Sequence, residues 1–305
     1  MSESQVWFVT GARSNFGLAL IRALLASNRR VVATARNLSA RPLPLAPSDS
    51  LLTLELDVLQ PTQIDAAFKA ALGKFGRVDV VVNKTGAPLM GEVEAVSDEL
   101  ARHVFETQFW GPLAVTKAAV KVFRESNPPG AGGRILNITS PLAFLNLPIF
   151  GIVGASKAAL EAATLSLTRE LPKEWNIHAL NIEPGAFEDA PVEGAVVWVE
   201  QPPVYAQAAP GSGAAVIRGM FGAEQHNIGD AGKMAQALIT LAGADRADLP
   251  MRAVLGSDVW AYTLGIAEKG VAEMKKGEAL ADSANRDGVD AEAVKQMAKM
   301  FVSAM

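Results

Sequence analysis

The chain has 305 residues, of which 50% are hydrophobic and 20% are charged, and its formal net charge is −4. This composition is typical of a globular protein, and its slight acidity excludes a broad attraction to nucleic acid or anionic membranes. No apolar run reaches the roughly 18 residues that a membrane-spanning helix needs. Cysteine is absent and the three histidines match no zinc spacing, so we expect no disulfide and no metal site.

Residues 1–5 are polar and lead directly into an apolar run. They lack the charged and apolar regions of a secretory signal, so a cytoplasmic location is the default expectation. The expected partner is a small-molecule substrate, with no nucleic acid and no membrane.

Short apolar runs alternate with longer amphipathic segments along most of the chain. Nearly continuous Val, Ile and Leu predict strands buried on both faces at residues 6–9, 31–34, 51–56, 78–82, 134–138 and 178–182. Apolar residues at a spacing of three to four predict helices at residues 18–27, 63–72, 98–124 and 156–171. This alternation predicts an α/β fold, a Rossmann-like doubly wound parallel sheet with helices on both faces. Ligands of such sheets bind beyond the carboxyl ends of the strands.

Three segments depart from this alternation. Residues 39–50 contain three prolines and predict a surface loop, and residues 188–228 are long and rich in Pro, Gly and Ala, which predicts a substrate lid. Helical spacing returns at residues 229–243 and 257–276, around a short apolar run at 252–255, and residues 290–305 fit one more helix. We therefore predict a single domain over residues 1–305, with a lid at 188–228 and a C-terminal helical extension at 257–305.

A glycine-rich turn follows the first predicted strand and opens the first predicted helix. Such a turn lets backbone N–H groups approach a pyrophosphate at the positive end of the helix. Asn15 stands where a middle glycine is expected, and asparagine is one of the few other residues that tolerate a positive φ. An ordinary tight turn is the alternative. The predicted cofactor-binding residues here are Gly11, Arg13, Ser14, Asn15, Phe16 and Gly17.

No acidic residue stands at the end of the second predicted strand, where it would hold the ribose 2′-hydroxyl of NAD. Arg36 and Asn37 follow this strand, and Arg13 is available from the glycine turn. A guanidinium group matches the geometry of a phosphate, whereas an acid would repel it. These residues favour NADP(H) over NAD(H). The alternative is that both arginines are merely solvated.

Six segments in this order resemble the short-chain dehydrogenase/reductase family, from residue 6 to at least residue 255. The turn at 10–17 is similar to the family's TGxxxGxG motif, Asp57-Val58 to its adenine-contacting pair, and residues 83–86 to its NNAG motif. Residues 137–140 resemble the strand that carries the active-site serine, residues 156–157 the end of the YxxxK motif, and residues 183–185 the proline–glycine turn beside the nicotinamide.

The resemblance implies further cofactor contacts from Asp57, Val58, Asn83, Lys84, Thr85, Lys157, Pro184 and Gly185. It also implies a homodimer or homotetramer built through the two long helices at 98–124 and 156–171, one interface of which the C-terminal extension could block. The extension itself resembles that of family members that act on retinoids, steroids and similar apolar ketones.

The resemblance also implies a catalytic set that this chain only half retains. In the family a tyrosine protonates the substrate oxygen, a lysine four residues later supports it, a serine binds the carbonyl, and an asparagine holds a relay water. Ser140 and Lys157 match the serine and the lysine, whereas Gln108 stands at the asparagine position and Val153 at the tyrosine position. Losing a general acid costs ~10² to 10⁴ in rate.

Three functions stay open. The first, which we favour, is an atypical NADP(H)-dependent reductase of a bulky, mainly apolar small molecule. An iminium substrate would need no proton, or Lys84, Glu188 or Asp189 would supply it to a carbonyl, unless the two acids only belong to a solvated loop. The second is a non-redox catalyst, such as a cyclase or isomerase, with NADP(H) as a structural cofactor. The third is a catalytically silent NADP(H)-binding protein.

Overall fold

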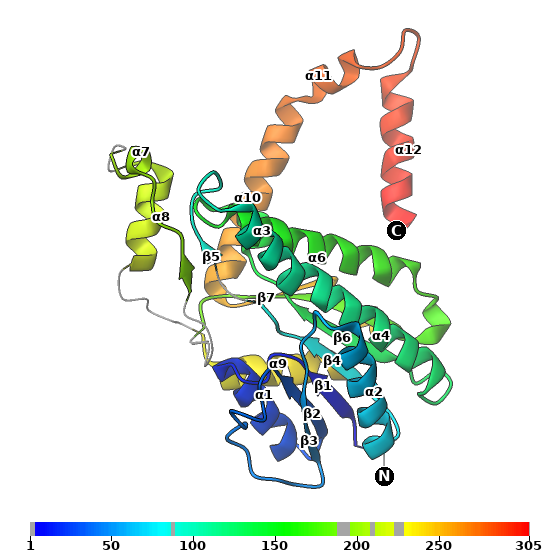
Figure 1. Ribbon diagram of the computed structural model, residues 1–305. Coiled ribbons are helices and arrows are strands. Elements are labelled where there is room, and N and C mark those ends of the chain that lie inside the picture. The colour runs from blue at the N-terminus through cyan, green and yellow to red at the C-terminus, as the bar shows by residue number, and fades with distance from the viewer. Residues whose placement is uncertain (1–3, 87–88, 188–195, 208–210, 223–228, 305) are drawn as a thin grey trace. The chain divides into compact units, whose positions relative to one another are not determined.

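The computed structural model describes residues 4–86, 89–187, 196–207, 211–222 and 229–304. A seven-stranded parallel sheet lies at its centre, in the order β3-β2-β1-β4-β6-β7-β9 (Figure 1). The predicted Rossmann-like fold is therefore confirmed, and the strand order reverses between β1 and β4. The strands are β1 (Val6–Val9), β2 (Arg30–Ala35), β3 (Leu51–Glu55), β4 (Val80–Asn83), β6 (Gly133–Ile138), β7 (Ile177–Pro184) and β9 (Arg252–Leu255).

Helices cover both faces of the sheet. On one face lie α1 (Asn15–Ala26) and α9 (Ala231–Gly243), and on the other lie α2 (Pro61–Phe75), α4 (Gly111–Glu125) and α6 (Gly151–Glu170). Successive side chains of a strand point to opposite faces, so Trp7 and Val9 pack in the first core while Val6 and Phe8 pack in the second. The inner strands β1, β2, β4, β6 and β7 are thus buried on both sides, as their apolar runs predict, whereas the edge strand β3 keeps Thr53 and Glu55 exposed.

Local capping explains where several helices begin. The Ser14 hydroxyl accepts the N–H of Gly17 at 3.0 Å at the start of α1, and the Asp230 carboxylate accepts the N–H of Lys233 at 2.7 Å at the start of α9. Pro61 stands in the first turn of α2, where its missing N–H costs nothing. These residue types are the ones that satisfy the unpaired donors of a first helical turn.

The structure corrects three predicted elements. The helix expected over residues 98–124 consists of α3 (Asp98–Phe105), a π-helical turn η1 (Glu106–Trp110) and α4. The apolar run at 252–255, to which the sequence assigned no element, is a full member of the sheet, β9. The strand expected from residue 78 begins at Val80, although the Asp79 N–H already donates to the carbonyl oxygen of Val6 at 2.8 Å.

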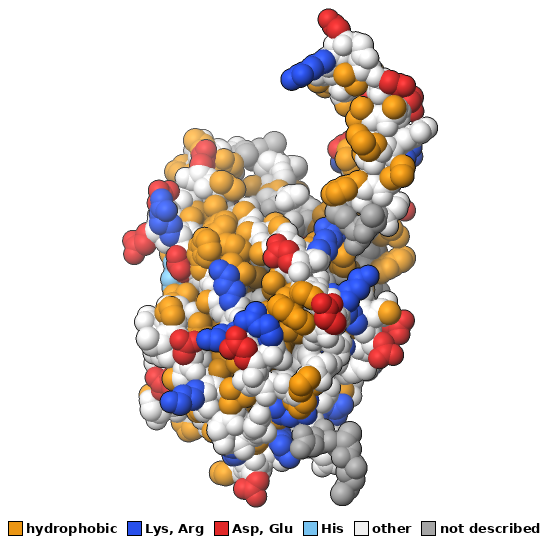
Figure 2. Space-filling model, turned by 90° about the vertical axis from the view of Figure 1, so that its right-hand side faces the viewer, with side chains coloured by type: hydrophobic (Ala, Val, Ile, Leu, Met, Phe, Trp, Pro, Cys, Tyr) orange, Lys and Arg blue, Asp and Glu red, His pale blue; other side chains and the backbone are white. Residues whose placement is uncertain are grey.

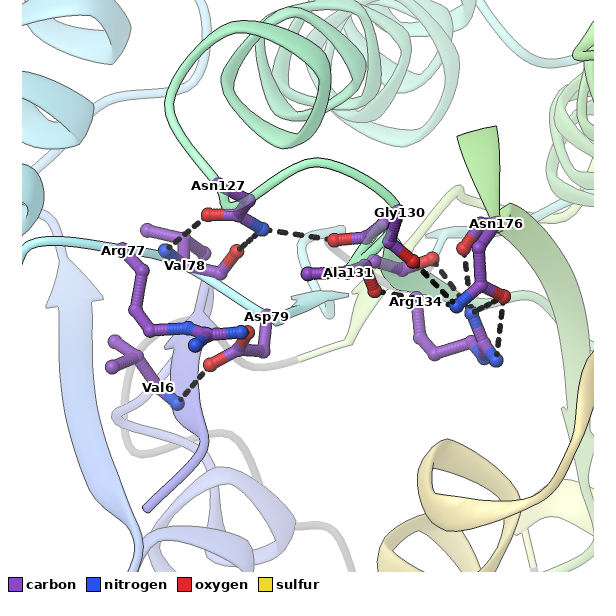
Figure 3. A network of polar contacts seen from close by, with 11 residues as sticks. Val6, Arg77, Val78, Asp79, Asn127, Gly130, Ala131, Arg134 and Asn176 are labelled. Carbon is purple, nitrogen blue, oxygen red and sulfur yellow. Dashed lines mark hydrogen bonds and ion pairs between the residues drawn. The ribbon is translucent and has the colours of Figure 1, made fainter. Parts of the chain in front are cut away.

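A polar network holds the amino-terminal edge of the sheet together (Figure 3). The Asp79 carboxylate accepts the N–H of Val6 and the Nε–H of Arg77, each at 2.8 Å. The Asn127 amide donates to the carbonyl oxygen of Val78 at 2.6 Å. Because this edge lies opposite the carboxyl ends of the strands, we assign the network to stability rather than to ligand binding. It continues through Gly130, Ala131, Arg134 and Asn176.

The described parts of the predicted lid lie beside the short strand at residues 89–90, which follows β4 in the chain. They comprise β8 (Val197–Trp198), α7 (Pro203–Ala206) and α8 (Gly213–Gly222), and β8 pairs in parallel with β5 (Leu89–Met90). Arg218 of α8 makes two contacts with the buried Glu92 carboxylate, from Nε at 2.8 Å and from Nη2 at 2.5 Å. The lid helix is thereby fastened to the segment that follows β5.

The chain divides into two compact units, Met1–Trp260 and Ala261–Met305. The division falls inside α10 (Ser257–Lys276), and the second unit also holds α11 (Glu278–Ser283) and α12 (Ala291–Ala304). The organisation of residues 1–305 as one domain stays a prediction. Of the helices in the described ranges, none combines the length and the apolar character needed to cross a membrane. Figure 2 shows apolar side chains along the second unit, where the exposed ones include Tyr262, Leu264, Met274, Met297, Met300 and Phe301.

Candidate cofactor and active site

A cleft opens at the carboxyl ends of the strands, beside the reversal of strand order between β1 and β4. This is the position at which doubly wound sheets bind ligands. The cleft therefore joins the segments that follow β1, β2, β3 and β4, although they are distant in sequence. Its lining residues are Thr10, Gly11, Arg13, Ser14, Thr34, Ala35, Arg36, Leu56, Asp57, Val58, Lys84, Thr85, Gly86, His103 and Thr107.

The glycine turn forms one wall of this cleft. Gly11 has a φ of +66°, and a Cβ at this position would overlap the carbonyl oxygen of Lys84. Asn15 is the first residue of α1 and does not have a positive φ, so the left-handed conformation considered for it is not used. The Phe16 side chain packs in the core, which leaves only its backbone to face a ligand. Of the predicted residues in this segment, Gly11, Arg13 and Ser14 line the cleft, whereas Asn15, Phe16 and Gly17 do not.

Two arginines flank the end of β2. The buried Arg13 side chain donates from Nη2 to the carbonyl oxygen of Asn37 at 3.3 Å, and Arg36 is exposed where it lines the cleft. Asn37 has a φ of +54° and contributes its backbone to this contact rather than to the cleft wall. Both guanidinium groups therefore line the cleft near the end of β2, where the sequence has no acidic residue.

Asp57 and Val58 follow β3 and both line the cleft. The Asp57 carboxylate accepts the N–H of Leu59 at 3.0 Å, and its own N–H donates to the Gln63 side chain at 2.8 Å. These contacts hold the backbone of the Asp57-Val58 pair, whose resemblance to the family predicts a contact with the adenine.

The residues after β4 separate into an interior and a cleft group. The Asn83 amide points inward and donates to the side chains of Asn137 at 2.8 Å and Thr116 at 3.1 Å, so it does not line the cleft. Lys84 and Thr85 do line it. The Lys84 N–H donates to the Thr10 hydroxyl at 3.0 Å, which binds the end of β4 to the glycine turn.

The predicted serine and lysine both lie near the end of β6. The Ser140 hydroxyl accepts the N–H of Leu142 at 3.2 Å. Lys157 of α6 is buried, and its Nζ donates to the carbonyl oxygen of Ile138 at 3.1 Å. Ser140 follows the end of β6 by two residues, and Lys157 binds the last residue of that strand. Helix α6 therefore brings the lysine close to the segment that carries the serine.

Val153 precedes Lys157 by four residues on α6 and so lies on the same face of the helix. Its side chain is buried in an apolar cluster with Leu89 and Val104. Within the first unit, the Tyr205 hydroxyl is engaged by Glu94. An aliphatic surface therefore stands one turn before the buried ammonium.

Gln108 lies on the π-helical turn η1 and is buried. Its side chain packs against Gly86, where a Cβ would come within 2.9 Å of the Gln108 Cγ. A π-turn shifts the register of the helix and frequently occurs at functional sites. It brings this longer amide against the backbone of the segment that resembles NNAG.

Burial, followed by the charges around it, shifts the pKa of Lys157. Burial and the nearby Lys84 ammonium lower the pKa of Lys157 to about 8, and the Glu161 carboxylate partly opposes this shift. The Lys157 ammonium is therefore a stronger acid than that of an exposed lysine, and it loses its proton closer to neutral pH.

The turn after β7 is held by hydrogen bonds to the end of β9 and to the start of α10. The Gly185 N–H donates to the carbonyl oxygen of Leu255 at 2.8 Å, and the Ala186 N–H donates to the Asp258 carboxylate at 3.0 Å. Pro184 ends β7 immediately before this turn. The predicted acids Glu188 and Asp189 lie outside the described residues.

Sequence reasoning missed several residues of the site. Thr10, His103 and Thr107 line the cleft, and the spacing of four between the last two was the available signal. Two buried acids were also missed: Glu161, whose charge acts on Lys157, and Glu183, whose charge acts on Glu161. Their signal was an acidic residue at the end of an apolar strand, and another one helical turn after the lysine.

Comparison with known proteins yields a match of residues 5–197 to the family model of short chain dehydrogenases. An uncharacterised oxidoreductase of Schizosaccharomyces pombe is 31% identical over 289 residues, which are 95% of this chain and 94% of that protein. The oxidoreductase CalM of Penicillium decumbens is 37% identical over 192 residues, which are 62% of this chain and 63% of that protein. A crystal structure of a short-chain dehydrogenase from Streptomyces avermitilis is 29% identical, with a TM-score of 0.79 over 94% of this chain and all of that one.

Proposed function

The chain belongs to the short-chain dehydrogenase family, and we propose that it is an NADP(H)-dependent oxidoreductase that reduces a bulky, mainly apolar small molecule without a catalytic phenol. The observation that carries this proposal is the pairing of a buried Lys157 with an aliphatic Val153 one helical turn before it, beside a cationic cleft.

The cleft fits a phosphorylated dinucleotide. Gly11, Arg13 and Ser14 of the glycine turn line it, at the position where such folds bind a pyrophosphate. Among the described lining residues, Arg13, Arg36 and Lys84 are cationic and Asp57 is acidic. This excess of positive charge, with two guanidinium groups at the end of β2, supports NADP(H) over NAD(H).

The polar groups of the site suit hydride chemistry. When bound, NADPH supplies the hydride. Since the Ser140 hydroxyl accepts the Leu142 N–H, its own hydrogen can be donated to a substrate oxygen, where it stabilises developing negative charge. Lys157 would hold the nicotinamide ribose, and Gln108 would fill the place of the family's asparagine.

A site without a phenol to donate a proton would reduce a narrower range of substrates. An iminium already carries the positive charge that hydride neutralises, so its reduction needs no proton at that position. A ketone needs an acid, and within the described cleft Lys84 is the candidate, because its ammonium is near enough to perturb Lys157. Glu188 and Asp189 remain sequence-based candidates for the same role.

The surroundings of Val153 support an apolar substrate. The cluster of Val153, Leu89 and Val104 also receives Val199 from the described part of the lid. A second apolar cluster of Met90, Ile149 and Phe150 receives Ile217 of α8. Both clusters lie where the lid joins the body of the first unit, so a substrate under the lid would meet mainly aliphatic surface.

The proposal also includes a cytoplasmic location and a homodimer or homotetramer built on the long helices α4 and α6. Trp110, which is exposed at the start of α4, would be covered in such an assembly. Light scattering coupled to size-exclusion chromatography of the full chain would give the mass, and a monomer would contradict this part.

Fluorescence titration of the purified protein with NADPH and NADH tests the cofactor assignment. Absorbance of NADPH is then followed with cyclic iminiums, bulky ketones and enones. We expect tighter binding of NADPH and its consumption with iminiums faster than with ketones.

Each other outcome identifies a different function. Equal or tighter binding of NADH would overturn the NADP(H) assignment. Binding without consumption, combined with a changed product profile from a reactive precursor, would establish the non-redox catalyst in place of the reductase. Binding with neither effect would establish a silent NADP(H)-binding protein.

A further inference from the structure

A buried charged cluster lies behind Lys157, on the side away from the glycine turn. Arg252 of β9 binds two carboxylates at once. Its Nε is 2.5 Å from an oxygen of Glu183 on β7, and its Nη2 is 3.0 Å from an oxygen of Glu161 on α6. One guanidinium therefore joins a helix to two neighbouring strands.

The cluster contains more acid than base. Glu161 is 6% exposed and Glu183 is 0% exposed, and one carboxylate oxygen of Glu183 has no hydrogen-bond partner among the described residues. Two ionised carboxylates on one guanidinium would leave a buried excess of negative charge. A buried charge of this kind is costly, so the cluster favours either a bound proton or a nearby cation.

Lys157 is the nearby cation. It stands one helical turn before Glu161 on α6, and both side chains are buried on the inner side of the helix. On its other side the Lys84 ammonium faces it from the cleft. Lys157 thus lies between a like charge that disfavours its ammonium and a carboxylate cluster that favours it.

We propose that Glu161, held by Arg252 and opposed by Glu183, is a positioning residue that keeps Lys157 in its charged form at the active site. Its use in catalysis rests on the proposed function, in which Lys157 holds the cofactor ribose. The electrostatic coupling itself does not depend on any bound ligand.

The protonation equilibria agree with this arrangement. Burial and the Glu183 carboxylate raise the pKa of Glu161 to about 7, while Arg252 and Lys157 lower it. The pKa of Lys157 is lowered to about 8. Glu161 therefore loses its proton just before Lys157 does as the pH rises. Between these values both groups are charged, and the carboxylate supports the ammonium.

Nuclear magnetic resonance of the cofactor-free full chain, labelled with ¹³C at lysine Cε and glutamate Cδ, tests the coupling. The Lys157 and Glu161 signals are assigned from the Lys157→Met and Glu161→Gln variants. In Glu161→Gln we expect the Lys157 midpoint to fall by about one pH unit, because a carboxylate one helical turn away is removed. In Lys84→Gln we expect the midpoint to rise, because a like charge is removed.

The opposite signs separate coupling from a general loosening of the fold, which would move both midpoints toward the value of a free lysine. A Lys157 midpoint that stays constant in a folded Glu161→Gln variant overturns the proposal. If that variant does not fold, the reciprocal measurement decides: in Lys157→Met the Glu161 midpoint must rise, since coupling acts equally in both directions. An unchanged Glu161 midpoint there overturns the proposal as well.

The same data distinguish this inference from the proposed function. If Lys157 and Glu161 are coupled but no substrate causes NADPH consumption, the reductase proposal is contradicted. The positioning role of Glu161 then applies to the binding of the cofactor ribose by Lys157. Consumption of NADPH without coupling would contradict the inference alone.

Discussion

Gly11 and Lys84 touch through their backbones at the switch point of the sheet. Gly11 has a φ of +66°, and the space that a Cβ would occupy is filled by the carbonyl oxygen of Lys84. The N–H of Lys84 is in turn held by the Thr10 hydroxyl at 3.0 Å. The glycine turn and the end of β4 therefore form one rigid wall of the cleft.

Gly11→Ala should damage this wall. The added methyl group must displace the Lys84 backbone, and alanine also disfavours the left-handed conformation. We expect a loss of ~2 kcal/mol or more in stability, in the range of strained core substitutions, together with loss of NADPH binding. Chemical denaturation and fluorescence titration measure the two effects.

Gly73→Ala is the matched control, because Gly73 lies in the exposed face of α2 and a Cβ there meets nothing within 4 Å. It should stabilise the protein by up to about 1 kcal/mol, the usual difference between glycine and alanine in a helix. Tight NADPH binding by Gly11→Ala would show that the turn does not face a pyrophosphate.

Arg36→Ala should change cofactor choice. Arg36 is exposed at the end of β2 and lines the cleft, where its guanidinium can donate hydrogen bonds to a 2′-phosphate. We expect NADPH affinity to fall by about tenfold or more, in line with ~1.5 kcal/mol for a charged hydrogen bond, and NADH affinity to stay nearly constant. The exposed Arg22 of α1 does not line the cleft, so Arg22→Ala controls for the change in net charge. Equal losses for both cofactors would argue against a 2′-phosphate contact.

Val153→Tyr should introduce ketone reduction. The phenol would stand one helical turn before Lys157, the spacing at which the family places its acid, and a general acid contributes ~10² to 10⁴ in rate. Since Val153 is buried with Leu89 and Val104, the larger ring should also cost about 1 to 3 kcal/mol of stability. Turnover of bulky ketones at saturating NADPH measures the gain.

Val153→Phe provides the comparison, because it adds nearly the same volume without a hydroxyl. It should lose stability to a similar extent and gain no ketone activity. A folded Val153→Tyr protein that binds NADPH and reduces no more ketone than Val153→Phe would mean that Val153 does not face the reacting centre.

Arg218→Met should release the lid helix. The Glu92 carboxylate is buried, and the Arg218 guanidinium lowers the pKa of this carboxyl below its ordinary value. Breaking a buried ion pair by removing one partner costs ~3 to 5 kcal/mol, here expressed as local opening of α8. We expect faster hydrogen exchange across residues 213–220, measured by mass spectrometry, with unchanged exchange in β1.

Arg102→Met is the matched control for the ion pair. Its partner Asp98 lies 3.7 Å away, and both side chains are largely exposed, so the exchange of α8 should not respond. Unaltered exchange of α8 in Arg218→Met would contradict a fastening role of the Glu92 contact.

His178 should make the protein sensitive to acid. Burial, followed by the charges of Arg246 and Arg134, lowers the pKa of His178 to about 4. Between pH 6.5 and pH 4 the unfolded chain then binds a proton that the folded chain does not, so stability falls as the pH falls through this window. The shift corresponds to about 3 kcal/mol. Glu161 acts in the opposite direction between pH 7 and its ordinary value of 4.5, because its folded pKa is raised.

The difference between wild type and His178→Leu isolates the histidine from these other groups. Urea unfolding at pH 7 and at pH 4.5 should show a smaller loss on acidification for His178→Leu than for wild type. His103→Leu, which alters an exposed histidine, should follow wild type. Parallel curves for wild type and His178→Leu would contradict a neutral buried imidazole.

Much of the fold followed from local patterns. Apolar runs of four to six residues located six of the seven sheet strands, because an inner strand buried on both faces must be apolar almost throughout. The π-helical turn around Gln108 was not predictable, since nothing in its residues distinguishes it from the regular helices on either side. The strand β9 was recognised only as an apolar run, because its place in the sheet depends on pairing with β7, about 70 residues earlier in the chain.

The candidate site shows the same division. Gly11, Ser14 and Lys157 were identifiable because their roles depend on residues within a few positions along the chain. By itself the sequence determined the doubly wound sheet, the glycine turn and the aliphatic residue one turn before the lysine. Only the tertiary structure decided that Arg252 meets Glu161 across 91 residues, and that Lys84 approaches Lys157. Helical and strand periodicity are local properties, whereas contacts between distant charged side chains depend on how the sheet is ordered.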